Sequence, residues 1–218
     1  NKSVVNVNPG VPTIGAVEKV RHQDVFGMLQ KFSSNYLSAN EKCLADYRWI
    51  KDSFNQWSRV YEYPFCFEIF RQELAEGAQV LDAGCGVTFF PFFLDSHFKV
   101  TCIDQDDYTD KFASINNSLH TQVSFKQSTL HDIRLRDNSF DAVYCISVLE
   151  HTNNFDVILK EFHRLLKPNG LIVITFDISL DDNTWGVNRE NAVSLIECIG
   201  KLFDLGYTKA DLEADLEQ

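Results

Sequence analysis

The chain has 218 residues, a hydrophobic content of 44% with 18 phenylalanines, and a formal net charge of −11 from 20 basic and 31 acidic residues. This length and composition fit one domain of ordinary size with a sizeable core. The acidic balance disfavours a nucleic-acid-binding protein, because a grip on phosphate backbones requires clustered lysine and arginine.

The cysteines and the hydropathy pattern indicate the cellular compartment of the protein. Six cysteines are spread along the chain without a C-x-x-C pair and without metal-ligand spacing to histidine. We therefore expect reduced thiols, no metal site and a cytoplasmic protein. No stretch has the length of a membrane span, and no signal peptide is evident, so no membrane partner is expected. The sequence leaves open whether the chain forms oligomers.

The N-terminal third is predicted to be an irregular arm followed by a helical cap. Residues 1–17 mix Asn, Pro and Gly with scattered valines, which is typical of an extended arm. Residues 18–76 turn helical, and one apolar helix face is expected at Leu44, Tyr47, Ile50 and Phe54. A second helix is expected to have Pro64 near its first turn and to be closed by a glycine at position 77.

Residues 77–206 alternate short apolar runs with helical segments and are predicted to form the core. Predicted strands are Gln79–Ala83, Lys99–Ile103, Thr121–Phe125, Phe140–Ile146 and Leu171–Phe176. Predicted helices are Phe89–Ser96, Tyr108–Asn117, Asn154–Leu166 and Arg189–Leu205. This alternation predicts an α/β fold with a Rossmann-like, doubly wound and mostly parallel sheet between two helix layers. Residues 207–218 are acidic and show no strand pattern, so they are predicted to be a tail.

The segment VLDAGCGVTFF, residues 80–90, predicts a ligand-binding turn after the first strand of the sheet. Ligands of open parallel sheets lie beyond the carboxyl ends of the strands, and glycines allow a tight turn and a close backbone approach. The dinucleotide fingerprint requires a third glycine where this chain has Phe89, whose bulky ring is expected to fill the place where a pyrophosphate would approach the helix start. Asp82 would repel a diphosphate but suits a cation. The turn therefore favours a positively charged nucleoside without phosphate, which describes S-adenosylmethionine.

Several ordered segments resemble the class I S-adenosylmethionine-dependent methyltransferases, in the broad group with FD-x-V…EH and LKPNG downstream of the glycine turn. They are VLDAGCG, CIDQDD at 102–107, FKQSTLHDIRLRDNSFDAVYCISVLEHT at 125–152 and FHRLLKPNGLIVITF at 162–176. The resemblance covers about Gln79–Phe176. It implies an enzyme that moves a methyl group from S-adenosylmethionine to a nucleophilic atom of an acceptor, with S-adenosylhomocysteine as the product.

The resemblance assigns the glycine turn to the cofactor. It implies that Gly84 and Gly86 let the chain pass under the methionine and ribose portions, together with the intervening Cys85 and the preceding Ala83. It implies that Asp82 contacts the methionine amino end.

The resemblance also assigns the ends of the following strands. It implies that Asp104 accepts hydrogen bonds from the ribose hydroxyls, that Gln105 flanks the adenine, and that Leu130 offers its N–H to the ring. Ile146 is expected near the transferred methyl group, with Ser147 beside it. Thr129 stands where relatives often carry an aspartate that binds the adenine amino group, so weaker adenine recognition or a shifted adenine ring is expected.

Three side chains outside these strands complete the expected site. His151 is the candidate general base, because its ordinary pKa lies near neutrality, although it could equally be a structural partner. Tyr61 and Tyr63 of the cap are expected to cover the cofactor as a lid, since an aromatic ring can shield a sulfonium. The final two strands of the family's sheet are absent from the pattern.

The sequence therefore predicts a methyltransferase with a small-molecule acceptor, favoured by the acidic balance and the helical cap. Two alternatives stay open. One is a different cofactor chemistry on the same fold, such as aminopropyl transfer or nicotinamide reduction. The other is a non-catalytic protein that keeps the nucleoside-binding fold, which the threonine at position 129 and the short C-terminus would suit.

Overall fold

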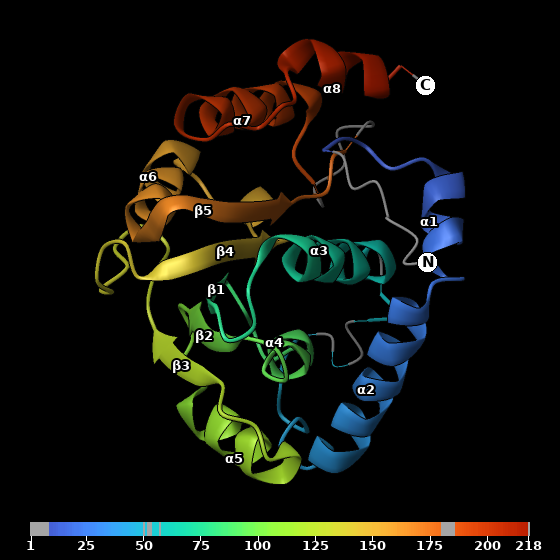
Figure 1. Cartoon of the computed structure of the whole chain (residues 1–218), viewed down its shortest axis with the longest axis vertical. Coiled ribbons are helices and arrows are strands. Elements are labelled where there is room, and N and C mark those ends of the chain that lie inside the picture. The colour runs from blue at the N-terminus through green and yellow to red at the C-terminus, as the bar shows by residue number, and fades with distance from the viewer. Residues whose placement is uncertain (1–8, 50, 52–53, 57, 180–185, 218) are drawn as a thin grey trace.

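The computed structural model describes residues 9–49, 51, 54–56, 58–179 and 186–217. Figure 1 shows how the elements are arranged. The helices are α1 (Ile14–Val20), α2 (Asp24–Asn40), α3 (Arg59–Glu73), α4 (Phe90–Leu94), α5 (Thr109–Leu119), the 3₁₀ turn η1 (Leu149–His151), α6 (Phe155–Leu165), α7 (Arg189–Leu202) and α8 (Lys209–Asp215). The strands are β1 (Gln79–Ala83), β2 (Lys99–Asp104), β3 (Ser124–Gln127), β4 (Phe140–Ile146) and β5 (Leu166–Thr175).

The strands form one parallel sheet in the order β3-β2-β1-β4-β5. The predicted doubly wound α/β fold is confirmed, and the described residues contain no sixth or seventh strand. The predicted bounds of β1 and β4 agree with the structure, whereas β3 begins three residues later than predicted and β5 begins at Leu166. The strand order reverses at β1, which pairs with β2 on one side and with β4 on the other.

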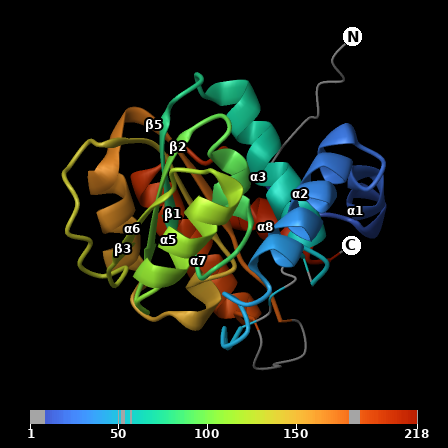
Figure 2. The same ribbon diagram turned by 90° about the horizontal axis from the view of Figure 1, so that it is seen from below.

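Helices cover both faces of the sheet, because alternate residues of each buried strand point to opposite sides. Val80 and Tyr144 pack with the helices α2, α3, α4 and α5. Leu81 and Val143 pack with α6 and α7. The cap helices thus share one core with the sheet, and Figures 1 and 2 both place α1 and α2 together along one side of the molecule.

The segment after α2 is not the helix that its apolar spacing predicts. α2 ends at Asn40, and turns follow over residues 41–46. Leu44 and Phe54 are still fully buried, so the pattern identified core residues but not the backbone that carries them. Ile50 lies outside the described residues. A physical reason is that the Tyr47 hydroxyl bonds to the backbone after the glycine turn, which an uninterrupted helix would not place there.

The boundaries of the cap also differ from the prediction. Helix α1 begins inside the predicted arm, where the Thr13 side chain accepts the Ala16 N–H as an N-cap. Helix α3 begins at Arg59, so Pro64 lies inside it and not in its first turn. The helix ends at Glu73, before the expected closing glycine.

The acidic C-terminal segment contains a helix. Thr208 and Asp211 form a capping box at the start of α8. Asp215 of this helix accepts the Val11 N–H at 3.1 Å and the Tyr207 hydroxyl at 2.6 Å, so the N-terminal arm and the C-terminal segment are in contact. None of the helices in the described ranges is long and apolar enough to cross a bilayer.

The shared core gives a stability prediction. Phe90 is fully buried, stacks on Tyr63 with ring centroids 4.5 Å apart, and meets Tyr144 edge-on at 5.6 Å. Phe90→Ala should lower the free energy of unfolding by about 3–5 kcal/mol, measured by urea denaturation. Met28→Ala, at a side chain 49% exposed on α2, should change it by about 0.5 kcal/mol or less. Equal small effects would show that the cap and the sheet do not share a core.

Candidate active site

A cavity of about 1340 Å³ opens at the carboxyl ends of β1, β2 and β4, where the strand order reverses. Open parallel sheets place ligands at this position. Most residues that the sequence predicted as site residues line this cavity: Asp82, Gly84, Cys85, Gly86, Asp104, Gln105, Thr129, Leu130, Ile146, Ser147, His151 and Tyr63.

The turn after β1 requires both of its glycines. Gly84 has φ +83°, and a Cβ there would lie 2.7 Å from a methyl carbon of Val148. Gly86 has φ +52°, and a Cβ there would lie 2.5 Å from the Tyr47 hydroxyl oxygen. The glycines are thus required by backbone conformation and by close packing from β4 and the cap.

Two cap tyrosines hold the backbone just after this turn. The Tyr36 hydroxyl donates to the Val87 carbonyl at 2.9 Å, and the Val87 N–H donates to the Tyr47 hydroxyl at 2.9 Å. Burial raises the pKa of Tyr36 well above its ordinary value, so its hydroxyl stays neutral. Sequence reasoning missed both residues, because an apolar pattern shows the ring and not the hydroxyl.

Asp104, at the end of β2, is fixed by backbone donors. One carboxylate oxygen accepts the Gly86 N–H at 2.9 Å, and the other accepts the Asp106 N–H at 3.0 Å. Asp106 in turn is ion-paired with Arg48 of the cap at 2.6 Å. Each carboxylate oxygen has a further lone pair, so Asp104 can also accept bonds from a ligand in the cavity.

Asp82 is a buried carboxyl group on the floor of the cavity. It is 5% exposed, and it accepts the Tyr144 hydroxyl at 2.7 Å. Burial raises the pKa of Asp82 to about 8, the Tyr144 bond opposes this shift, and Asp104 adds to it. A cation placed beside Asp82 would favour its ionised form.

The end of β4 carries a strained residue tied to the cap. Ser147 has φ +47°, a conformation uncommon for residues other than glycine. Its hydroxyl donates to buried Glu62 of α3 at 2.9 Å, and Arg59 donates to the same carboxylate at 2.7 Å. Sequence reasoning missed Arg59 and Glu62, whose spacing on a helix resembles that of an ordinary surface pair.

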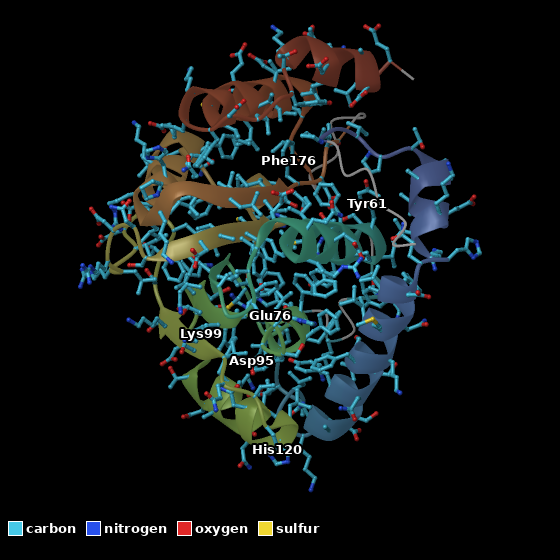
Figure 3. All side chains as sticks on the ribbon, viewed as in Figure 1. Tyr61, Glu76, Asp95, Lys99, His120 and Phe176 are labelled. Atoms are coloured by element: carbon cyan, nitrogen blue, oxygen red, sulfur yellow. The ribbon has the colours of Figure 1, made fainter. Side chains whose placement is uncertain are left out.

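Two predicted site residues lie elsewhere. Ala83 is fully buried and packs on the opposite face of the sheet, with the core under α6 and α7. Tyr61 stacks on Phe65 and lines a second cavity of about 1130 Å³ that runs along β5. Figure 3 labels Tyr61 and Phe176 in this region between α3 and the C-terminal helices. Of the two tyrosines expected as a lid, only Tyr63 borders the first cavity.

The Phe89 ring does not lie where the sequence analysis expects it. Its ring is 1% exposed and packs edge-on against Phe54 at 5.7 Å and Tyr63 at 5.3 Å. The ring therefore lies in the core under the cap and does not itself fill a phosphate position. A diphosphate is disfavoured because both arginines that line the cavity are already ion-paired with acids.

The donor set fits the cofactor that the sequence suggests. Asp82 suits a cationic amino group, Asp104 can accept bonds from ribose hydroxyls, and Leu130 and Ile146 offer apolar surface for the adenine and the sulfonium portion. The residues present therefore fit a nucleoside with a positive charge.

Comparison with known proteins agrees with this geometry. Residues 81–174 match the family described as methyltransferase domain. This part of the chain therefore resembles a methyltransferase domain. The match bears out the family resemblance predicted from the sequence, and with it the expected cofactor.

Individual relatives show how far the similarity extends. The chain is 33% identical over 105 residues to a sterol 24-C-methyltransferase of Aspergillus fumigatus, covering 45% of this chain and 27% of that protein. It is 30% identical over 102 residues to a ubiquinone biosynthesis O-methyltransferase of Rickettsia akari, covering 44% and 39%. The chain thus spans well under half the length of these relatives.

A solved structure supports the fold. A SAM-dependent methyltransferase from Aquifex aeolicus superposes with a TM-score of 0.56 at 22% identity, covering 67% of this chain and 84% of that one. At this level of identity the likeness concerns the fold alone.

The two ends of the sheet provide a matched pair of variants. Asp104→Ala should weaken binding of S-adenosylhomocysteine, measured by calorimetry, by about tenfold or more, because its carboxylate also holds the glycine turn. Asp141 lies at the start of β4, where it accepts the Gln79 N–H and pairs with Lys167. Asp141→Ala should lower thermal stability and leave the affinity within about twofold. The reverse pattern would place the ligand at the other end of the sheet.

The raised pKa of Asp82 predicts a pH-dependent affinity. Below pH 8 the buried carboxyl is mostly protonated, so binding a cationic amino group must release a proton. S-adenosylhomocysteine carries this amino group, and its affinity should rise by about fivefold to tenfold from pH 7 to pH 8.5. Asp82→Asn keeps an acceptor for Tyr144 and should abolish this rise. A wild-type affinity that falls over this range would contradict the assignment.

Proposed function

We propose that this protein transfers a methyl group from S-adenosylmethionine to a nucleophilic atom of a small-molecule acceptor. The observation that supports this most is Asp104, an ordered carboxylate at the end of β2 that is bonded to the glycine turn within a methyltransferase domain. When bound, S-adenosylmethionine supplies an electrophilic methyl group.

The residues of this chain bind and orient the cofactor. Asp104 would hold the ribose, Asp82 the amino end, and Leu130 with Gln105 and Thr129 the adenine. Ile146 and Ser147 would border the methyl group. Because the cofactor brings its own electrophile, the protein contributes mainly by fixing the two reactants and by excluding water.

The acceptor side is formed by the ends of β4 and β5 and by the cap. Glu150, His151 and Asp177 line the cavity there, together with Ser58 and Arg59 of the cap. A small acceptor is in keeping with the two relatives, whose names specify a sterol and ubiquinone biosynthesis. The acidic net charge disfavours nucleic acid.

Binding and turnover test the proposal in two steps. By calorimetry, S-adenosylhomocysteine should bind with one site per chain and raise the melting temperature, whereas NADH should do neither. The protein should then incorporate label from methyl-labelled S-adenosylmethionine into small molecules of a cell extract that has been freed of macromolecules. Binding of NADH instead would overturn the cofactor. Binding of S-adenosylhomocysteine without any transfer would favour a non-catalytic protein on this fold.

A further inference from the structure

Buried polar atoms without a hydrogen-bond partner lie at the ends of β4 and β5. Among the described residues, only two buried side-chain oxygen or nitrogen atoms have no hydrogen-bond partner, Oε2 of Glu150 and Oγ1 of Thr175. Both lie at this end of the sheet, since Thr175 is paired with Ile146 in the β4–β5 ladder. Buried polar atoms without a partner are rare and call for an explanation by function or by a ligand.

Glu150 is held at this position by the backbone. It belongs to η1, directly after β4, and it lines the cofactor cavity. Its Oε1 accepts the Asp177 N–H at 3.4 Å, a long bond that leaves the carboxylate weakly stabilised. Burial raises the pKa of Glu150 to about 7, to which Asp177 and Glu62 contribute.

The charges around Glu150 leave an excess of acid. Asp177 and Glu150 line the same cavity, and burial also raises the pKa of Asp177. The facing cation Arg59 is ion-paired with Glu62 at 2.7 Å. The remaining titratable neighbours are the exposed His151 and the buried Cys145 thiol, whose pKa is raised by burial and by Glu150.

No lysine, arginine or histidine in the described part of the chain forms an ion pair with Glu150 or Asp177. Two partly buried carboxyl groups without a paired cation favour a cationic ligand.

We propose that Glu150 and Asp177 bind a nitrogen acceptor in its ammonium form and that Glu150 takes its proton. This inference rests on the proposed function and names its acceptor class. The ammonium group R–NH3+ transfers one proton to the Glu150 carboxylate, and the amine lone pair is released. The amine then forms a C–N bond to the methyl carbon as the C–S bond breaks, with that bond's electron pair left on sulfur. The product is the methylated ammonium ion.

The first test measures binding without turnover. With S-adenosylhomocysteine bound, primary amines from methylamine to phenethylamine are titrated by calorimetry, each beside the alcohol of the same skeleton. At least one amine should bind more tightly than its alcohol, and Glu150→Gln should weaken that amine by about tenfold or more. Glu76→Gln, at a side chain 74% exposed near the amino end of the sheet, is the matched control and should leave it unchanged.

The second test follows the proton. At saturating S-adenosylmethionine, the rate of methyl transfer to the amine that binds best should rise with pH through about 7, because Glu150 must be ionised to accept a proton. Glu150→Gln should reduce the rate by about 10²–10⁴-fold and remove this rise. His151→Asn should keep the rise.

Three results would overturn the inference. They are amines binding no better than their alcohols, amine affinity unaffected by Glu150→Gln, and a pH rise that disappears in His151→Asn while remaining in Glu150→Gln. The S-adenosylhomocysteine affinity of each variant separates this failure from that of the proposed function. If that ligand fails to bind the wild type, the proposed function fails. If it binds while the amine effects are absent, only the acceptor assignment fails.

Discussion

The backbone turn between β1 and α4 is the constraint on which the site depends. It reverses the chain with two residues at positive φ, Gly84 and Gly86, and neither position has space for a side chain. Three parts of the molecule hold it. Val148 packs on it from the end of β4, Asp104 binds it from the end of β2, and Tyr47 of the cap bonds to the next residue. The same groups form the walls of the cavity, so the turn and the site are stabilised together.

The cap is therefore part of the site and not an addition to it. Tyr36 and Tyr47 of the cap form hydrogen bonds with the backbone after the turn. Helix α3 places Arg59 and Glu62 beside the strained Ser147. The rings of α3 and α4 interleave in one core, which explains how a helix as short as α4 is kept in place. The shape of the cavity depends on this packing.

Much of this arrangement could be predicted from the sequence. Short, mostly apolar runs such as residues 79–83 and 140–146 predict the bounds of two strands correctly, because parallel strands covered by helices on both faces are rich in apolar residues. The spacing of Asp104 from the glycine turn predicts a carboxylate beside that turn, since adjacent parallel strands end at the same edge of the sheet. These inferences depend on local periodicity and on topology, which a sequence displays.

Other features depend on contacts that a sequence does not display. The segment around Tyr47 has helical spacing but forms turns, because the hydroxyl bonds to Val87. Ala83 and Tyr61 are close in sequence to true cavity residues but point to the other face of the sheet and to the second cavity. The sequence favours His151 over its neighbour Glu150 as a base, since the ordinary pKa of glutamate lies well below neutrality. Only the folded environment raises its pKa to about 7.

A crystal structure with S-adenosylhomocysteine tests the central claim most directly. The account predicts that the ribose hydroxyls lie within hydrogen-bonding distance of the Asp104 carboxylate, that the amino group lies near Asp82, and that the sulfur lies near Ile146. An empty cavity at saturating ligand, or a ligand bound along β5 in the second cavity instead, would contradict it.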